Sequence, residues 1–307
     1  MTVYARTDPI GSRLRAAVLR WYRTSGRVLA FRSTSDPWAI LVSEFMAQQT
    51  QAARAAEAWE RFIVEFPTPA ALAEASPADA LRAWRGLGYN RRALSLRAAA
   101  RVIVERHGGR VPSDLAALDA LPGVGPYTAR ALAALAFGQR FGAVDTNVRR
   151  VLGRALFDEP PPPRELQSAA DALVPADRPG EWTHALMDVG ATFCRPRNPR
   201  CSECPIQPWC RYAARAGSAP APIARDARPR TRPTRLAEPP FPETSRWLRG
   251  RILDRLRDAP PEAWVAFDGP IGAHGLPAIA GALDQLASEH LLELREDGPT
   301  EARLPSH

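Results

Sequence analysis

The chain has 307 residues with a formal net charge of +8, and 45% of its residues are hydrophobic. This length suits two or three packed domains. No apolar run approaches the roughly 18 residues that a membrane-spanning helix needs, and no secretory signal pattern is visible, so we expect a cytoplasmic, nucleoid-associated protein that binds no membrane. The positive charge favours nucleic acid as the partner over a cationic surface that is merely solvated.

The sequence contains no lysine, so all 41 of its Lys and Arg residues are arginines. A GC-rich coding sequence accounts for this composition without any functional reason. The chemical consequence is that no side-chain amine is available to form a Schiff base with a substrate.

Helical patterns fill the first two thirds of the chain, and no alternating strand pattern precedes residue 211. Asp36-Pro37 before WAILVSEFMAQQ and Ser76-Pro77 before ADALRAW are typical of an N-cap followed by a first-turn proline. Ser113 is the expected cap of the short helix in DLAALDAL. These signals predict a largely helical fold.

The stretch LPGVGPYTAR, residues 121–130, predicts a tight turn between two helices. Gly123 and Gly125 allow a positive φ and the close approach of another backbone, and Pro126 suits the first position of a helix. Free N–H groups at the start of the second helix form an anion site, so a DNA phosphate can bind at Gly123, Val124 and Gly125 whatever the base sequence. The alternative is an ordinary helical hairpin.

All four cysteines lie in CRPRNPRCSECPIQPWC, residues 194–210. Disulfides would be spread over a small secreted domain, whereas thiols clustered in a long intracellular chain indicate a metal site. Zinc and a [4Fe–4S] cluster both accept four thiolates, and the spacing alone leaves the choice open. The expected ligands are Cys194, Cys201, Cys204 and Cys210.

Composition changes after Tyr212. Residues 213–240 are rich in Pro, Ala and Arg without periodicity, which predicts an extended linker that can run along DNA phosphates. Helical spacing returns in TSRWLRGRILDRLRD and GLPAIAGALDQLASEH, and LLELRE follows as a strand. This order favours a small winged-helix-like α+β module over residues 241–307, with a role in DNA contact or in plain packing and dimerisation.

Five motifs resemble those of the helix-hairpin-helix (HhH-GPD) DNA glycosylases, in that family's order: LVSEFMAQQTQ, GLGYNRRA, LPGVGPYTA, VDTNVRRV and the cysteine cluster. The branch most similar is that of the MutY-like adenine glycosylases. The resemblance implies an all-α glycosylase fold, with a six-helix domain over 31–142 and an iron–sulfur helical domain over 1–30 and 143–212, followed by the linker and the α+β module.

The resemblance also favours a [4Fe–4S] cluster over zinc. It implies base excision repair on double-stranded DNA that contains a mismatched or damaged base, with removal of adenine opposite guanine or 8-oxoguanine. We expect the protein to act as a monomer.

Hydrolysis of an N-glycosidic bond needs an acid for the leaving base and a carboxylate near the developing oxocarbenium ion. The resemblance implies Glu44 as the acid, Asp145 as the catalytic carboxylate and Asn147 as the residue that positions it. Without the resemblance, Asp145 is more simply a helix N-cap, and Glu44 belongs to a polar stripe with Gln48 and Gln51. Burial would raise the pKa of Glu44, as an acid needs near neutral pH.

Tyr127 stands where bifunctional relatives carry a lysine, whose amine attacks the sugar and leads to strand cleavage. A tyrosine ring cannot do this, and the chain offers no other amine than its own N-terminus. We therefore predict a monofunctional glycosylase that leaves the strand intact.

A target base must leave the duplex before it reacts, at a cost of roughly a few kcal/mol. The resemblance implies that Gln48, Gln49 and Thr50 intercalate and that Tyr89 wedges into the opposite strand, although a core aromatic is the alternative for Tyr89. Arg32 matches the arginine of the family's Pro-Trp-Arg stretch and is expected at the base, although the Pro-Trp is absent here.

Three departures from the adenine enzymes keep other functions open. His184 replaces the usual base-reading Gln or Glu; it either pairs with a base and titrates near physiological pH or is a buried structural histidine. Ala52 replaces the usual valine and resembles thymine-mismatch glycosylases. Residues 241–307 are too short for the Nudix-like domain that inspects 8-oxoguanine. The alternatives are a glycosylase for thymine or uracil opposite guanine and, in another class, a non-catalytic DNA-binding protein on this scaffold.

Overall fold

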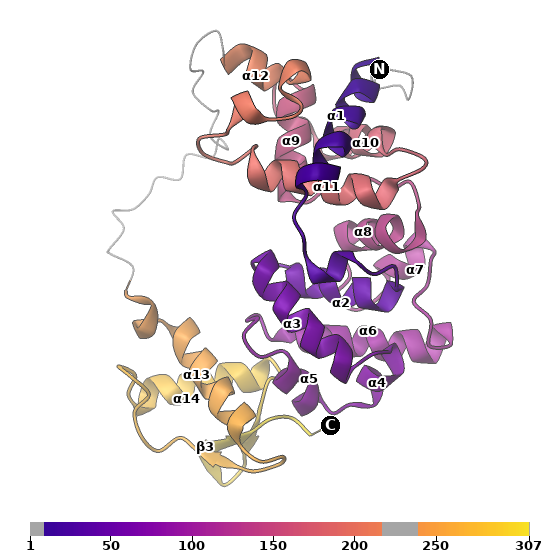
Figure 1. The fold of residues 1–307 in the computed structure, drawn as a ribbon. Coiled ribbons are helices and arrows are strands. Elements are labelled where there is room, and N and C mark those ends of the chain that lie inside the picture. The colour runs from indigo at the N-terminus through magenta and orange to yellow at the C-terminus, as the bar shows by residue number, and fades with distance from the viewer. Residues whose placement is uncertain (1–8, 217–238, 307) are drawn as a thin grey trace. The chain divides into compact units, whose positions relative to one another are not determined.

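A computed structural model describes residues 9–216 and 239–306 (Figure 1). Contacts along the chain divide it into two compact units, residues 1–44 with 111–227 and residues 45–110 with 228–307. Both units consist mainly of helices, as the sequence predicts. Among the described residues, no helix is long and apolar enough to cross a membrane. The domain boundaries expected at residues 30, 142, 212 and 240 stay a prediction.

The first unit is built around one central helix, α11, which packs against α1, α8 and α9. Its core is made of aliphatic side chains such as Leu14, Leu152 and Leu186, none of them more than 3% exposed. A Cβ atom at Gly190 would lie 2.6 Å from Asn147 Cβ, so this glycine lets α11 approach α9 closely. The helices of this unit are α1 (Pro9–Ser25), η1 (Ala30–Arg32), α2 (Pro37–Ala47, shared with the second unit), α7 (Leu115–Asp119), α8 (Pro126–Phe137), α9 (Thr146–Leu156), α10 (Pro163–Leu173), α11 (Pro179–Thr192), η2 (Cys201–Glu203), η3 (Gln207–Trp209) and α12 (Arg211–Ala216).

The second unit packs α6 against α4 and α5 around buried Phe62, Trp84 and Leu96. Phe62 and Trp84 meet edge to face, with ring centroids 6.0 Å apart. The elements of this unit are α3 (Ala52–Glu65), α4 (Pro69–Glu74), α5 (Pro77–Ala83), α6 (Arg91–His107), η4 (Phe241–Glu243), α13 (Ser245–Asp258), β1 (Val265–Ala266), α14 (Leu276–Ser288), β2 (Glu293–Arg295) and β3 (Gly298–Arg303).

The N-caps follow the sequence signals with one exception. The Asp36 carboxylate accepts hydrogen bonds from the amides of Trp38 and Ala39, at 3.3 and 3.2 Å, and Ser76 forms a capping box with Asp79 at the start of α5. The expected cap at Ser113 is wrong. Helix α7 begins at Leu115, so the residue at its N-cap is Asp114, which accepts from the Ala117 amide at 2.9 Å.

The C-terminal module, which we define as residues 239–306, contains the two predicted helices and the predicted strand in order (Figure 1). Two further strands were not predicted: β1 lies between the helices and β3 follows β2. Helices α13 and α14 pack together and the three strands pair antiparallel in the order β1-β3-β2. The strand expected over LLELRE is shorter, because the Leu291 amide still donates to Leu286 O in the turn that ends α14. The predicted linker lies mostly outside the described residues; its first residues, 213–216, belong instead to helix α12.

Candidate active site

Glu44 is the one charged residue in α2, a helix of otherwise apolar side chains apart from Ser43, and is only 9% exposed. Burial, and to a lesser degree the charge of Asp145, raise the pKa of its carboxyl from 4.5 to about 7, although a hydrogen bond from Tyr127 and the charge of Arg32 oppose the shift. The alternative of a polar stripe fails, because Glu44 is buried while Gln51 is exposed. A carboxyl with this pKa can exchange a proton at neutral pH.

Tyr127 lies in the first turn of α8, where the charges of both the Glu44 and the Asp145 carboxyls act on it. Its hydroxyl donates a hydrogen bond to Glu44 and lies 3.9 Å from Met187 Sδ. Burial, followed by the charges of Glu44 and Asp145, raises the pKa of this phenol well above its usual value. The structure therefore brings together Glu44, Tyr127 and Asp145, and the tyrosine serves as a neutral hydrogen-bond donor.

The N-cap interpretation of Asp145 is confirmed, while its catalytic role stays a prediction. It is the N-cap of α9, where its carboxylate accepts from the Val148 amide at 2.6 Å and from Asn147 Nδ2 at 3.0 Å. Asn147 Oδ1 accepts in turn from Arg150 Nη2 at 2.7 Å, and the same nitrogen donates to Gly190 O at 2.9 Å. This network orients the Asp145 carboxylate and anchors Asn147 to α11.

Arg32 is held by an acid that sequence analysis did not single out. Arg32 donates to Asp188 Oδ2 and Oδ1 at 2.8 and 2.9 Å, and the Arg27 side chain donates to Oδ1 at 2.7 Å. Asp188 is fully buried, and despite this burial the two arginines lower the pKa of its carboxyl. Its only sequence signal is its position one helical turn after His184, on the same face of α11.

A cavity of about 310 Å³ lies in the first unit and is lined by both predicted base-reading residues of this unit, Arg32 and His184. Burial and the positive charge of Arg32 lower the pKa of His184 to about 3. The expectation that His184 titrates near physiological pH is therefore wrong, and the imidazole stays neutral. The other lining residues are Tyr22, Phe31, Thr34, Ile40, Ser43, Leu135, Gly180 and Glu181.

The remaining predicted recognition residues lie in the second unit, on the loop after α2 and on the loop before α6. The guanidinium of Arg92 hydrogen-bonds to both loops. Gln49 and Tyr89 adopt positive φ angles of 54° and 44°, a conformation that residues with a side chain rarely take. Tyr89 is 49% exposed, which contradicts a core role. Arg92, a residue that sequence analysis did not single out, donates to acceptors at the end of α2 and on both loops: Phe45 O, Met46 O, Gln48 O, Thr50 Oγ1, Leu87 O and Gly88 O, at 2.6–3.2 Å. Ala52, the first residue of α3, follows the first loop.

The tight turn joins α7 to α8 as expected, but its two glycines differ. Gly123 has the left-handed φ of 77°. Gly125 has an extended φ of −111°, so it does not use the conformational freedom that a glycine allows there. A Cβ at Gly125 would meet no atom of the chain within 4 Å. No side chain caps α8, which leaves its first N–H groups open to a ligand.

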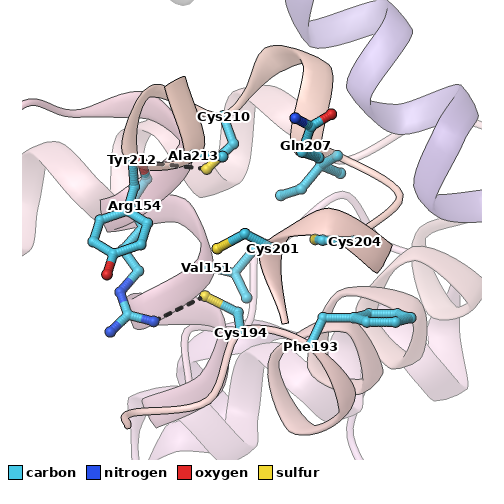
Figure 2. A pocket seen from close by; sticks show the side chains of 11 residues that line it. Val151, Arg154, Phe193, Cys194, Cys201, Cys204, Gln207, Cys210, Tyr212 and Ala213 are labelled. Carbon is cyan, nitrogen blue, oxygen red and sulfur yellow. Dashed lines mark hydrogen bonds between the residues drawn. The ribbon is translucent and has the colours of Figure 1, made fainter. Parts of the chain in front are cut away.

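The four cysteines line one cavity between α9 and the loop 194–210, together with the apolar side chains of Val151, Phe193 and Ile206 (Figure 2). All four are free thiols and partly buried. Burial raises the pKa of Cys204 to about 12, so its thiolate needs a positive centre nearby. Four thiols in apolar surroundings fit a thiolate-bound cluster.

Arg154 on α9 closes one side of this cavity. It donates to Cys194 Sγ at 3.5 Å and to the carbonyls of Arg195 and Pro196, at 2.8 and 3.2 Å (Figure 2). Arg200 is engaged by the exposed Glu203, with Nε 2.7 Å from Oε1. In the part of the chain that the structure describes, no three His, Cys, Asp or Glu side chains gather closely enough to hold a single metal ion.

Comparison with known proteins identifies the family. The model of the HhH-GPD superfamily of base excision DNA repair proteins matches residues 42–176, and that of the iron–sulfur binding domain of endonuclease III matches residues 194–210. The chain is 45% identical to an adenine DNA glycosylase of Mycobacterium tuberculosis, over 79% of this chain and 78% of the relative. It is 40% identical to one of Mycolicibacterium smegmatis, over 92% and 93%. A solved thermostable thymine-DNA glycosylase is 30% identical and superposes with a TM-score of 0.64 over 67% of this chain and 97% of that one.

The chain therefore belongs to the HhH-GPD superfamily of base excision DNA repair proteins, in the branch of the MutY-like adenine DNA glycosylases. It is a DNA glycosylase, and the cofactor of the cysteine loop is a [4Fe–4S] cluster, as the sequence predicts.

Replacement of one cluster ligand tests what the cluster supports. We expect Cys201→Ser to lower the iron and acid-labile sulfide content, because only three thiols then remain to bind the cluster. Hydrogen exchange of residues 194–216 should become faster, because the cluster no longer links them. Metal analysis and hydrogen exchange of this segment measure both effects. Ser202→Ala, on the neighbouring exposed residue, is the control and should keep the cluster. Equal metal content in the two variants would contradict the ligand assignment.

The buried acid gives a second prediction. Asp188→Asn leaves Arg32 and Arg27 without their anionic partner, so the free energy of unfolding should fall by about 3–5 kcal/mol. The control Asp177→Asn removes an exposed carboxylate that pairs with Arg178 at 2.9 Å, and its effect should stay below about 1 kcal/mol. Urea unfolding of the full chain measures both, and similar losses in the two variants would refute the structural role of Asp188.

Proposed function

We propose that this protein is a monofunctional glycosylase that removes adenine mispaired with guanine or 8-oxoguanine by hydrolysis of the N-glycosidic bond. The observation that carries the proposal is the buried Glu44, whose pKa of about 7 suits an acid, next to a tyrosine that also senses Asp145. The curated relatives of 40–45% identity bear the name adenine DNA glycosylase.

In this proposal Glu44 donates its proton to a ring nitrogen of the extruded adenine, which then leaves as a neutral base. The Asp145 carboxylate stabilises the positive charge that develops on the sugar, with its orientation held by the Val148 amide and Asn147. Glu44, now a carboxylate, accepts a proton from the water that attacks the sugar. The Tyr127 hydroxyl donates to Glu44 and keeps it oriented through both steps.

The cavity beside Arg32 and His184 is the proposed site of the adenine. Neutral His184 offers one ring donor and one ring acceptor, which matches the donor and acceptor pattern on an adenine edge. Asp188 holds Arg32 so that its guanidinium cannot fold away from the cavity. These contacts suit a base that carries both an amino group and a ring nitrogen acceptor.

DNA binding is assigned to three elements. The uncapped start of α8 with the Gly123–Gly125 turn takes a phosphate. The loops with Gln48, Gln49 and Thr50 and with Tyr89 enter the duplex and fill the space of the extruded base. We also propose that the protein acts as a monomer in the cytoplasm, where the chromosomal substrate is.

A second candidate is removal of thymine or uracil opposite guanine. Ala52 and the 35% identity to a thymine-DNA glycosylase of Aeropyrum pernix, over 65% of this chain and 93% of that one, favour it. The buried acid at Glu44 favours adenine, because protonation of the leaving base is what a purine requires.

The acid gives the central prediction. On a panel of duplexes with A, T or U opposite guanine and 8-oxoguanine, followed by alkali, the wild type should act on the adenine duplexes. Glu44→Gln should lose at least about 10²-fold in single-turnover rate. The wild-type rate should fall as pH rises through about 7, the pKa of Glu44, because only the protonated form donates. Release of T or U in place of adenine would establish the second candidate instead.

The pH dependence of stability tests the raised pKa of Glu44 independently of activity. The folded pKa of about 7 exceeds the unfolded value of 4.5, so the folded state binds the proton more tightly and stability falls as pH rises between these two values. The loss is on the order of 3 kcal/mol for one group, and Glu44→Gln should abolish it. An unchanged pH dependence in this variant would mean that Glu44 is not a buried acid.

Absence of a lyase step is tested at Tyr127. The wild type should leave an abasic duplex intact, with nicking no faster than in the protein-free control, because no lysine amine is available. In Tyr127→Lys, a buried amine of lowered pKa is placed beside the sugar, so borohydride should trap a covalent DNA adduct. Tyr127→Phe is the matched control without an amine, and rapid nicking by the wild type would refute the monofunctional assignment.

A further inference from the structure

We infer that the C-terminal module positions the Tyr89 loop, residues 86–90, so that wedging into the duplex depends on helix α13. The inference rests on the proposed function of Tyr89 as the wedge. It gives the module a role that neither its fold nor the comparisons assign.

Arg257 of α13 is a buried cation, 8% exposed, that contacts helix α5 and the Tyr89 loop directly. Its Nη2 donates to Asn90 Oδ1 at 2.7 Å, and its Nε donates to Leu81 O at 2.9 Å. Asp254, one turn earlier on α13, accepts from its Nη1 at 3.2 Å. Since Asn90 directly follows Tyr89, this arginine of the C-terminal module holds the last residue of the Tyr89 loop in place.

Arg246, near the start of the same helix, contacts the wedge residue itself. Its guanidinium lies 5.2 Å from the centre of the Tyr89 ring, and that of Arg92 lies 5.7 Å away. Tyr89 has a positive φ and an exposed ring, a combination that persists only where neighbours hold it. Two arginines of α13 supply this support: Arg246 lies at the Tyr89 ring, and Arg257 binds the next residue, Asn90.

The module also contacts the residue that precedes this loop, Arg85, and helix α5. Asp258, the last residue of α13, accepts from Arg85 at 2.5 Å, and Pro305 O accepts from the Ala78 amide of α5 at 3.1 Å. Contacts at the end of α13 and at the C-terminal end of the module therefore hold the module against α5 and the start of the Tyr89 loop.

Charge within the module argues against base reading by α14, the helix that follows β1. Helix α14 carries no arginine, and its one charged residue is Asp284. Helix α13 carries five arginines, one of which, Arg249, is tied to Glu289 at 2.7 Å. Of the five arginines of α13, Arg246 and Arg257 are those that contact Tyr89 and Asn90.

A double-mutant cycle on the full chain tests the inference. The variants are Arg246→Ala, Arg257→Met and Tyr89→Ala, alone and combined, with Arg251→Ala as control, because Arg251 pairs with Asp254 within α13. The readouts are the single-turnover excision rate and the fluorescence of 2-aminopurine placed next to the partner base, which rises when a wedge unstacks it. We expect Arg246→Ala to lose roughly threefold to tenfold in both, and neither arginine variant to add to the loss in Tyr89→Ala.

Additive losses, or losses no larger than in Arg251→Ala, would overturn the inference while Tyr89→Ala still shows the wedge to be real. If Tyr89→Ala is as active as the wild type, the wedge assignment and the inference both fail, whereas an inactive wild type is a failure of the proposed function alone. Arg246 is exposed, so its removal leaves the fold intact; should Arg257→Met not fold, Asn90→Ala removes the same hydrogen bond from the other side.

Discussion

Burial of one carboxyl group, that of Glu44, is the constraint on which the first unit depends. Helix α2 surrounds it with apolar neighbours, and the resulting desolvation brings its pKa to about 7. Without opposing contacts, the same burial would keep the group protonated and unable to release its proton. Tyr127 and Arg32 supply these contacts, and Arg32 in turn needs Asp188 to stay near the site. The proposed hydrolysis requires both protonation states of Glu44, and this balance makes both accessible near neutral pH.

The second unit meets a different constraint, since the two loops proposed to recognise DNA have a strained backbone. Gln49 and Tyr89 both have positive φ, a strain that a free loop would relax. Arg92 binds carbonyls on both loops from within, and α13 reaches the second loop from the C-terminal module. The guanidinium is suited to this task because its five donors can serve several carbonyl acceptors at once.

The sequence predicted the helices, the turn and the cysteine loop because these signals are local. Caps and first-turn prolines lie within three residues of the helices they start, and even the error at Ser113 was a single residue. The arginine and aspartate contacts were missed because they join residues far apart: Arg32 and Asp188 are separated by 156 positions, and Arg257 and Asn90 by 167. In a chain with 41 arginines, composition cannot show which of them are buried.

The surroundings of His184 overrule the interpretation that its residue type suggests. Histidine suggested a pH switch, yet burial beside the cationic Arg32 lowers its pKa to about 3, so the imidazole is neutral at physiological pH. The proposed acid, Glu44, has a pKa of about 7 and so does change its charge near neutral pH. In the proposed site, His184 therefore keeps one pattern of donor and acceptor while Glu44 changes its protonation state. This separation allows recognition of the base to persist through the proton transfer that releases it.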